Sequence, residues 1–455
     1  MLAGDFAALG HCAQSAHSFR MKRLAAFALS LVSVISVIAC SSSGVDRNAG
    51  TEDGGGLGPI LPNDGGTSSG EQIGTLSGRV FAPNGRLPMP GALVYVTREK
   101  PAALPTQTYC DKCIDTGSGN SSTLSRSDGK FELKVYQAGT FYLVTQKGQF
   151  RRVRKIEVKA GNATVADEDT TFPSATSGDD TAPLMAVVGT RTDGYDRIEI
   201  SLEKLGITQY DFIEPGQAAA FIKSAAKMQK YHVVFLPCGA GDVGGPGACG
   251  TDRAADAGTK TALRDFVSSG GKLYVTDFSY EYLNQSWPGY VNWTAQKQGV
   301  IPSPLPGVIP DMPGPDWSKD GRGTACTTEP WNGEAKFEDN DLNGWLHQSD
   351  VFGAGKIELE GNWTTAASVN EVTGKNENGV DTKITPKIWA RGKKGNDFIP
   401  TTLSFQDTCG RVLFSSYHTE NDESTSASDL TAQEASLLYV LLEVNGCIGD
   451  HPNVQ

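Results

Sequence analysis

Tyr231–Gly239 reads Tyr-His-Val-Val-Phe-Leu-Pro-Cys-Gly, and Gly270–Tyr280 reads Gly-Gly-Lys-Leu-Tyr-Val-Thr-Asp-Phe-Ser-Tyr. Each segment holds a short apolar run, Val233–Leu236 and Leu273–Thr276, which is typical of a strand buried on both faces. A glycine-rich segment and a helical pattern over Thr259–Ser269 lie between them. The order strand, loop, helix, strand predicts the middle of an open α/β sheet, where ligand sites gather at the carboxyl ends of the strands.

The α/β pattern continues on both sides of this stretch, and we place an α/β domain at residues 182–450. Before it we expect strands at 184–189 and 210–213 with helices at 195–205 and 216–227. After it we expect strands at 386–391, 400–405 and 411–417 and a last helix at 430–444. An insertion at about 285–357 interrupts the pattern and holds Trp287, Trp293, Trp317, Trp331 and Trp345, which argues against disorder.

Residues 73–162 show a different pattern, with short alternating runs and turn signals between them. Thr75–Phe81, Ala92–Thr97 and Lys130–Val135 alternate or are apolar, and Pro83–Gly85 marks a turn. This pattern predicts a small antiparallel β-sandwich. The fold class is therefore multidomain: a β-sandwich followed by an α/β domain with a long insertion.

The N-terminal region has the features of an export signal. Met21-Lys22-Arg23 is basic, an apolar run follows, and the run ends Val37-Ile38-Ala39-Cys40. This resembles the lipobox of bacterial lipoproteins, which implies that Cys40 is lipidated and that residues 1–39 are an over-predicted start plus signal peptide. Ser41 after the cysteine favours the outer membrane over the inner one. Residues 40–72, rich in Gly, Ser, Asp and Pro, are expected to be a flexible tether.

Charge excludes some partners. Without residues 1–39 the chain has 37 basic and 51 acidic side chains, a net charge of −14. An acidic surface repels nucleic acid and anionic headgroups, so we expect no nucleic-acid partner. The expected membrane contact is the lipid anchor.

The β-region resembles the carboxypeptidase regulatory-like domain. The residues that carry this resemblance are Gly78–Phe81, Pro90–Val96 and Ser127–Phe131, over about 85 residues. The resemblance implies a structural or carbohydrate-binding-like module that has no catalytic residues of its own.

The α/β region resembles the class I glutamine amidotransferase-like fold, especially its ThuA-like branch. The resembling segments are Val233–Pro237, Phe266–Asp277, Pro386–Arg391 and Cys409–His418. The resemblance implies a flavodoxin-like domain. It also implies a Cys-His-Glu site whose cysteine sits on a sharp strand-to-helix elbow.

This chain departs from that pattern at the nucleophile. The equivalent elbow, Asp277–Tyr280, has no cysteine, and Cys238 follows the preceding strand instead. His418 and Glu420 match the family's histidine and glutamate, which leaves Ser279 as the candidate nucleophile. We therefore assign no catalytic residue and favour His418 as a hydrogen-bonded residue at a strand end.

Asp339, Asp341, Asn343 and Asp350, with Gly344, fit the oxygen positions of a twelve-residue calcium loop. The alternative is a helix in which Leu342, Trp345 and Leu346 share one face and Asp339 or Asn340 is the N-cap. We expect no cofactor, with calcium as the alternative.

Seven cysteines remain after Cys12 and Cys40 are set aside. In an oxidising compartment we expect the pairs Cys110–Cys113, Cys238–Cys249 and Cys409–Cys447, with Cys326 left over. A disulfide at Cys238 excludes it as a thiolate nucleophile.

Two hypotheses for function follow. The first is a non-enzymatic lipoprotein of the cell envelope that binds glycans or protein partners. The second is an envelope hydrolase that uses Ser279, His418 and Glu420.

Overall fold

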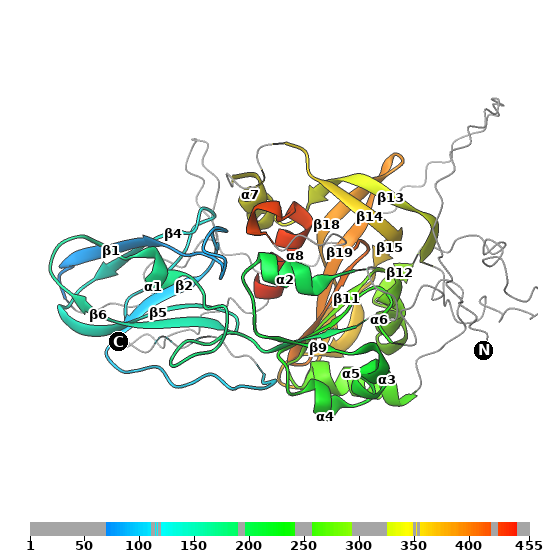
Figure 1. Cartoon of the computed structure of the whole chain (residues 1–455), viewed down its shortest axis with the longest axis horizontal. Coiled ribbons are helices and arrows are strands. Elements are labelled where there is room, and N and C mark those ends of the chain that lie inside the picture. Colours follow the sequence, from blue (N-terminus) through cyan, green and yellow to red (C-terminus); the bar gives the residue numbers. More distant parts are fainter. Residues whose placement is uncertain are drawn as a thin grey trace, which may run out of the picture. The chain divides into compact units, whose positions relative to one another are not determined.

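The computed structural model describes residues 70–110, 114, 116, 120–189, 196–241, 257–293, 325–348, 352, 355–419 and 426–443 (Figure 1). All of them belong to one unit, Leu57–Gln455. The signal peptide, Cys40 and nearly all of the predicted tether lie outside the described residues. No helix among the described residues has both the length and the apolar character needed to cross a membrane.

The first part of the described chain, which we call the β-module, forms two sheets. One has the strand order β4-β1-β7 and the other β3-β2-β5-β6. The strands are β1 (Gly74–Arg79), β2 (Leu93–Thr97), β3 (Ser122–Leu124), β4 (Lys130–Val135), β5 (Gly139–Lys147), β6 (Phe150–Val158) and β7 (Ala163–Thr164). The pairings are antiparallel except that β7 runs parallel to β1.

A nine-stranded sheet follows, with the order β14-β13-β18-β19-β20-β11-β10-β8-β9. Its parallel half consists of β8 (Met185–Val188), β9 (Tyr210–Ile213), β10 (Val233–Leu236), β11 (Lys272–Thr276) and β20 (Gly410–Ser415). In chain order these five strands are arranged 2-1-3-4-5, which is the flavodoxin-like order. The flavodoxin-like prediction is therefore confirmed at the level of strand order, and the strands predicted at 233–236 and 273–276 are confirmed as β10 and β11.

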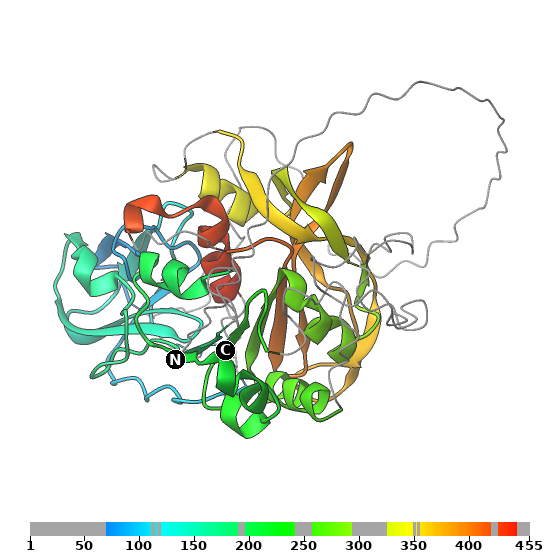
Figure 2. The same ribbon diagram turned by 45° about the vertical axis from the view of Figure 1, so that its right-hand side comes forward.

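Helices cover both faces of this sheet (Figures 1 and 2). The helices are α2 (Ile198–Lys204), α3 (Pro215–Ile222), α4 (Ala225–Met228), α5 (Ala257–Ser268), α6 (Tyr280–Ser286), α7 (Asn340–Gln348) and α8 (Ala432–Glu443). Successive strand residues face opposite cores: Val233 and Phe235 pack with α2, α7 and α8, whereas Val234 and Leu236 pack with α3, α5 and α6. The central strands carry apolar side chains on both faces because both faces of the sheet are buried under helices.

The antiparallel half of the sheet comes from the later part of the chain. It contains β13 (Cys326–Phe337), β14 (Glu358–Thr364), β18 (Lys387–Lys394) and β19 (Asp397–Asp407). The smaller elements are α1 (Asp167–Thr170), η1 (Asp277–Ser279), β12 (Val291–Trp293), β15 (Ala366–Val369), β16 (Val372–Lys375), β17 (Asp381–Ile384) and η3 (Ala427–Asp429). The described part of the predicted insertion is therefore not a separate unit, because β13 joins the main sheet.

Two tryptophans of this region, Trp345 and Trp287, are buried in two different hydrophobic clusters. Trp345 is fully buried, its ring lies 5.2 Å from that of Tyr439, and its indole donates to the carbonyl of Pro88 at 2.7 Å. Trp287 is nearly buried against Phe405. These side chains serve packing, which is the common use of large aromatic residues.

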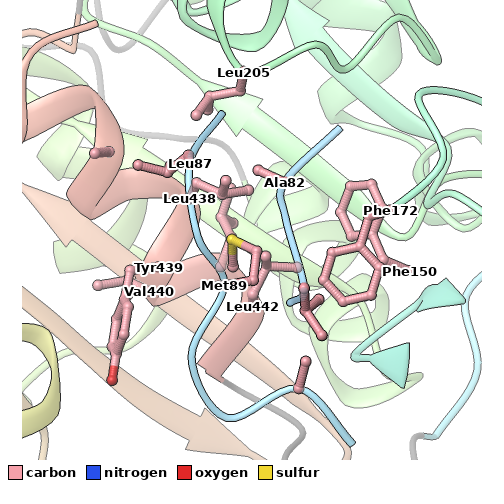
Figure 3. Close-up of a cluster of buried hydrophobic side chains, with 14 of the residues drawn as sticks. Ala82, Leu87, Met89, Phe150, Phe172, Leu205, Leu438, Tyr439, Val440 and Leu442 are labelled. Atoms are coloured by element: carbon pink, nitrogen blue, oxygen red, sulfur yellow. The ribbon is translucent and has the colours of Figure 1, made fainter. Parts of the chain in front are cut away.

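The β-module and the α/β domain share one hydrophobic core. Figure 3 shows residues of the β-module and the segment after it packed against Leu205 and α8; the labelled residues are Ala82, Leu87, Met89, Phe150, Phe172, Leu205, Leu438, Tyr439, Val440 and Leu442. Phe150 and Leu438 are both fully buried. Burial of apolar surface contributes roughly 25 cal/mol per Å², so the shared core couples the stability of the two parts.

The long loop between β2 and β3 also lies against the α/β domain. The Thr108 N–H donates to the carbonyl of Gln229 at 3.0 Å, and the Tyr109 ring packs edge-on against His232. Gly270 has no room for a Cβ, which would lie 1.9 Å from the Tyr109 carbonyl oxygen. This docking brings the end of the loop to the turn between β19 and β20.

At that turn Cys110 forms a disulfide with Cys409, with the Cα atoms 4.9 Å apart. The predicted pairs Cys110–Cys113 and Cys409–Cys447 are therefore wrong. The pair Cys238–Cys249 is wrong as well, because Cys238 is a free, buried thiol. The predicted pairs rest on proximity along the chain, whereas docking of the loop decides the observed partner.

We predict that Cys110→Ser and Cys409→Ser each lower the free energy of unfolding by about 2–5 kcal/mol, because the bond closes a long loop in the unfolded chain. The double variant should lose no more than either single variant, since one bond is lost in every case. Chemical denaturation checks this. Losses that add in the double variant would contradict the pairing.

Candidate functional site

Three neighbouring parallel strands end at the same edge of the nine-stranded sheet, and residues that follow them form the candidate site. Cys238 lies two residues after β10, Asp277 directly after β11, and His418 three residues after β20. Much of the surrounding loops, residues 190–195, 242–256 and 420–425, lies outside the described residues. The position agrees with the rule that open α/β sheets bind ligands at this edge.

Asp277 occupies the elbow between β11 and η1. Its φ is 45°, in the left-handed region that non-glycine residues rarely adopt. Such strain costs on the order of 1–3 kcal/mol and is concentrated at functional sites. Asp277 therefore adopts a strained conformation at the position equivalent to the family's elbow, although its bulky neighbours argue against such a turn.

Cys238, Asp277 and His418 converge. One ligand atom from each, the Sγ, a carboxylate oxygen and a ring nitrogen, lies within 4.8 Å of the other two. His418 Nε2 and Asp277 Oδ2 form an ion pair at 2.9 Å. In the sequence Cys238 comes one strand too early for the elbow, but the pairing of neighbouring strands brings it beside the elbow residue.

The group is buried and short of hydrogen bonds. Asp277 is 0% exposed and Cys238 1%, while the His418 side chain is 13% exposed. Within the described part of the chain, neither carboxylate oxygen of Asp277 nor His418 Nε2 has a hydrogen bond of good geometry. Two of these atoms, Asp277 Oδ2 and His418 Nε2, face each other in the ion pair, and Thr364 also interacts with the Asp277 carboxylate.

Burial and mutual interaction shift all three pKa values. Burial raises the pKa of Asp277 to about 6, against the lowering effect of His418. Burial also raises the pKa of the Cys238 thiol to about 11, and the Asp277 carboxylate adds to that rise. Burial alone lowers the pKa of His418, but Asp277 and Cys238 together raise it well above its usual value. Near neutral pH the group therefore holds a thiol, an imidazolium and a carboxylate.

This arrangement differs from a nucleophilic triad. In a triad the nucleophile and the acid bind opposite nitrogens of the histidine. Here a single ring nitrogen of His418 lies within 4.8 Å of both Cys238 and Asp277. A reactive cysteine also needs a lowered pKa, whereas that of Cys238 is raised. Sulfur, nitrogen and oxygen donors that lie within 4.8 Å of one another are instead the ligand types of a transition-metal site.

The other predicted catalytic residues do not join this group in the described structure. The Ser279 hydroxyl is fully buried and donates to the Pro237 carbonyl at 2.6 Å, a contact that fixes the loop after β10. Glu420 lies outside the described residues. The sequence indicates that His418 occupies the position of the family's histidine. It does not indicate that His418 pairs with Asp277, because the family has a cysteine at the position of Asp277.

The calcium loop proposed at Asp339 is replaced by helix α7. The Asp339 carboxylate caps this helix by accepting the Leu342 N–H at 2.8 Å, and its other oxygen meets Lys387 Nζ at 2.6 Å. The helical alternative is thus the one that forms. Asp350 lies outside the described residues.

The comparisons with known proteins give likenesses of fold only. No family model and no curated protein matches the chain. Among solved structures, the chain is similar to a cytoplasmic protein from Salmonella typhimurium, with 10% identity, 57% of this chain and 98% of that one covered, and a TM-score of 0.32. A ThuA-like protein from Bacteroides uniformis has 10% identity, coverages of 58% and 93%, and a TM-score of 0.28.

A protein from Thermoplasma acidophilum that is described as part of a GMP synthase has 8% identity, coverages of 57% and 98%, and a TM-score of 0.28. These neighbours include the kinds of protein that the predicted resemblance names. Because every TM-score is this low, we base the fold class on the strand order: the larger part of the chain is a flavodoxin-like α/β domain with an antiparallel extension.

We predict that the ion pair makes the metal-free protein less stable as pH rises above 6.5. A raised His418 pKa stabilises the folded state fully below the unfolded pKa of about 6.5, and this contribution is lost as pH rises through the folded value. The slope for one proton is at most about 1.4 kcal/mol per pH unit.

His418→Gln and Asp277→Asn should each remove this part of the slope, because each lacks one partner. Urea denaturation at pH 6.5 to 9 in the presence of a chelator checks the prediction. A slope in either variant equal to that of the unmodified protein would count against the pairing.

Proposed function

We propose that this chain is a lipid-anchored protein of the cell envelope whose α/β domain holds a zinc-class divalent ion for metal-assisted hydrolysis. The proposed ligands are Cys238, Asp277 and His418. The observation that supports the proposal is the convergence of their three donor atoms within 4.8 Å at the carboxyl edge of the sheet.

A divalent ion at this point would take the place of the His418 proton as the positive partner of the Asp277 carboxylate. Asp277 is a fully buried carboxylate whose two oxygens have no hydrogen bond of good geometry among the described residues. A divalent ion supplies positive charge there without needing a donor hydrogen, and it stabilises the deprotonated form of a coordinating thiol. Cysteine, histidine and aspartate are all common zinc ligands.

The described residues supply three ligands, which is the number that a catalytic zinc site uses together with one position for water or substrate. A zinc ion bound there would lower the pKa of such a water enough to supply hydroxide near neutral pH. We therefore assign the site to hydrolysis.

Two observations support the envelope as the location. The sequence ending at Cys40 has the pattern of a lipidated N-terminus, with Ser41 favouring the outer membrane. The Cys110–Cys409 disulfide suits an oxidising compartment. In this proposal the β-module is a carboxypeptidase regulatory-like sandwich, and the substrate is a component of the cell envelope.

We predict that the chelator-stripped protein binds one zinc ion, and that Cys238→Ser, Asp277→Asn and His418→Ala each weaken binding by on the order of 100-fold or more, since a lost ligand should cost at least as much as a lost outer-shell partner. Calorimetric titration with zinc checks this. Ser125→Ala is the matched control, because its buried hydroxyl donates to a backbone carbonyl, that of Met89, but lies in the β-module.

Zinc binding that is absent, or unchanged in all three variants, would overturn the proposal. Metal-free protein that cleaves ester substrates only when Cys238 is intact would indicate a thiol nucleophile instead. Hydrolysis assays on amide and ester substrates with and without zinc separate these outcomes.

A second candidate function, glycan binding, is favoured by an aromatic pair beside the site. Phe278, the neighbour of Asp277, and Trp363 of β14 lie with their ring centroids 5.8 Å apart, and both are half-buried. Partly exposed aromatic faces suit the apolar faces of sugar rings. The pair is therefore an aromatic surface next to Asp277 that suits a polysaccharide.

We predict that Trp363→Ala lowers retention of the protein on envelope polysaccharides in a pull-down, because it removes the larger of the two rings. Phe212→Ala, at an exposed aromatic residue on the edge strand β9, is the control and should be retained like the unmodified protein. Equal retention of the Trp363 variant, or no retention of any form, would remove this candidate.

A further inference from the structure

Asp196 is a second buried carboxylate at the same edge of the sheet. It lies between β8 and α2, two residues before α2 begins, and is 3% exposed. It is not among the three converging residues, and no motif in the sequence singles it out. Its importance comes from its hydrogen bonds.

The Asp196 carboxylate connects two strand ends directly. Oδ1 accepts the backbone N–H of Thr419 at 2.8 Å, and Oδ2 accepts the hydroxyl of Thr276. Thr419 follows His418 in the chain, and Thr276 precedes Asp277. The first bond holds the backbone next to His418, and the second holds the side chain next to Asp277.

A third strand end is reached through Thr276. Its Oγ1 accepts the backbone N–H of Cys238 at 2.9 Å. Because the same hydroxyl gives its proton to Asp196, its orientation is fixed from both sides. One carboxylate and one hydroxyl thus connect the chain at Cys238, beside Asp277 and beside His418.

We propose that Asp196 is the positioning residue of the site: its hydrogen bonds set the spacing of Cys238, Asp277 and His418. The inference rests on the proposed metal function for its biological meaning, but the hydrogen bonds exist without a metal. Bonds to an ionised carboxylate are roughly twice as strong as neutral ones, and Thr276 and Thr419 are both buried. Outer partners of this kind orient ligands in metal sites.

The direct test is Asp196→Asn, which keeps the shape of the side chain and removes its charge. We expect zinc affinity to fall roughly 10- to 100-fold, the usual effect of losing an outer partner. Asp180→Asn is the matched control, because Asp180 is also a mostly buried carboxylate but binds Arg154 and Val153 in the β-module. An Asp196 variant with unchanged affinity would overturn the inference.

Thr276 offers a second test if the Asp196 variant fails to fold. Thr276→Val removes the hydroxyl with little change of volume, and Thr276→Ser keeps it. Positioning through this hydroxyl predicts that valine lowers zinc affinity and serine restores it. A purely structural role would lower the melting temperature of the valine variant and leave its zinc affinity unchanged, which would overturn the inference.

A metal-independent measurement separates this inference from the proposed function. If the unmodified protein binds no zinc, the proposed metal function is wrong. The positioning role of Asp196 is then tested by comparing the ring resonances of His418 by NMR in the metal-free proteins. Asp196→Asn should shift these resonances, and Asp180→Asn should leave them in place. Resonances unmoved in the Asp196 variant would overturn the positioning role as well.

Discussion

The parallel pairing of β11 with β10 on one side and β20 on the other is the constraint on which the candidate site depends. Leu236 pairs with Val275, and Thr276 pairs with Ser415, so the three strands end in step. Residues 238, 277 and 418 are far apart in the chain and meet because of this register. A one-residue slip would turn the side chains of a strand to its other face and break up the group.

Several unfavourable features coincide at Asp277. The residue holds a left-handed backbone conformation, buries a carboxylate, and leaves both of its oxygens without well-formed hydrogen bonds in the described structure. The conformation of Asp277 is held by the strand β11 that precedes it and by the hydrogen bonds of the neighbouring Thr276. Proteins keep such local strain where the surroundings over-determine it, and a perturbed, buried titratable group is a mark of a functional site.

The sequence predicted the parallel strands well because Val233–Leu236 and Leu273–Thr276 are apolar on both faces, a pattern with one common explanation. It also located the position equivalent to the family's elbow and considered His418. It missed the ion pair between Asp277 and His418, because comparison with a family that uses cysteine treats an aspartate at that point only as a missing cysteine. It missed the partner of Cys110 because only the docked loop places that residue at Cys409. Contacts of this kind depend on tertiary packing and leave no local pattern.

The Cys110–Cys409 link has a consequence for the order in which the molecule is completed. Its two ends are 299 residues apart, and the loop that carries Cys110 lies on the α/β domain. The β-module also buries its side chains against α8, the last described helix. The β-module therefore cannot reach its final state until the chain as far as α8 is available to fold with it. Contacts between residues so far apart in the chain form slowly. The strands of the β-module are therefore exposed to aggregation until these contacts form.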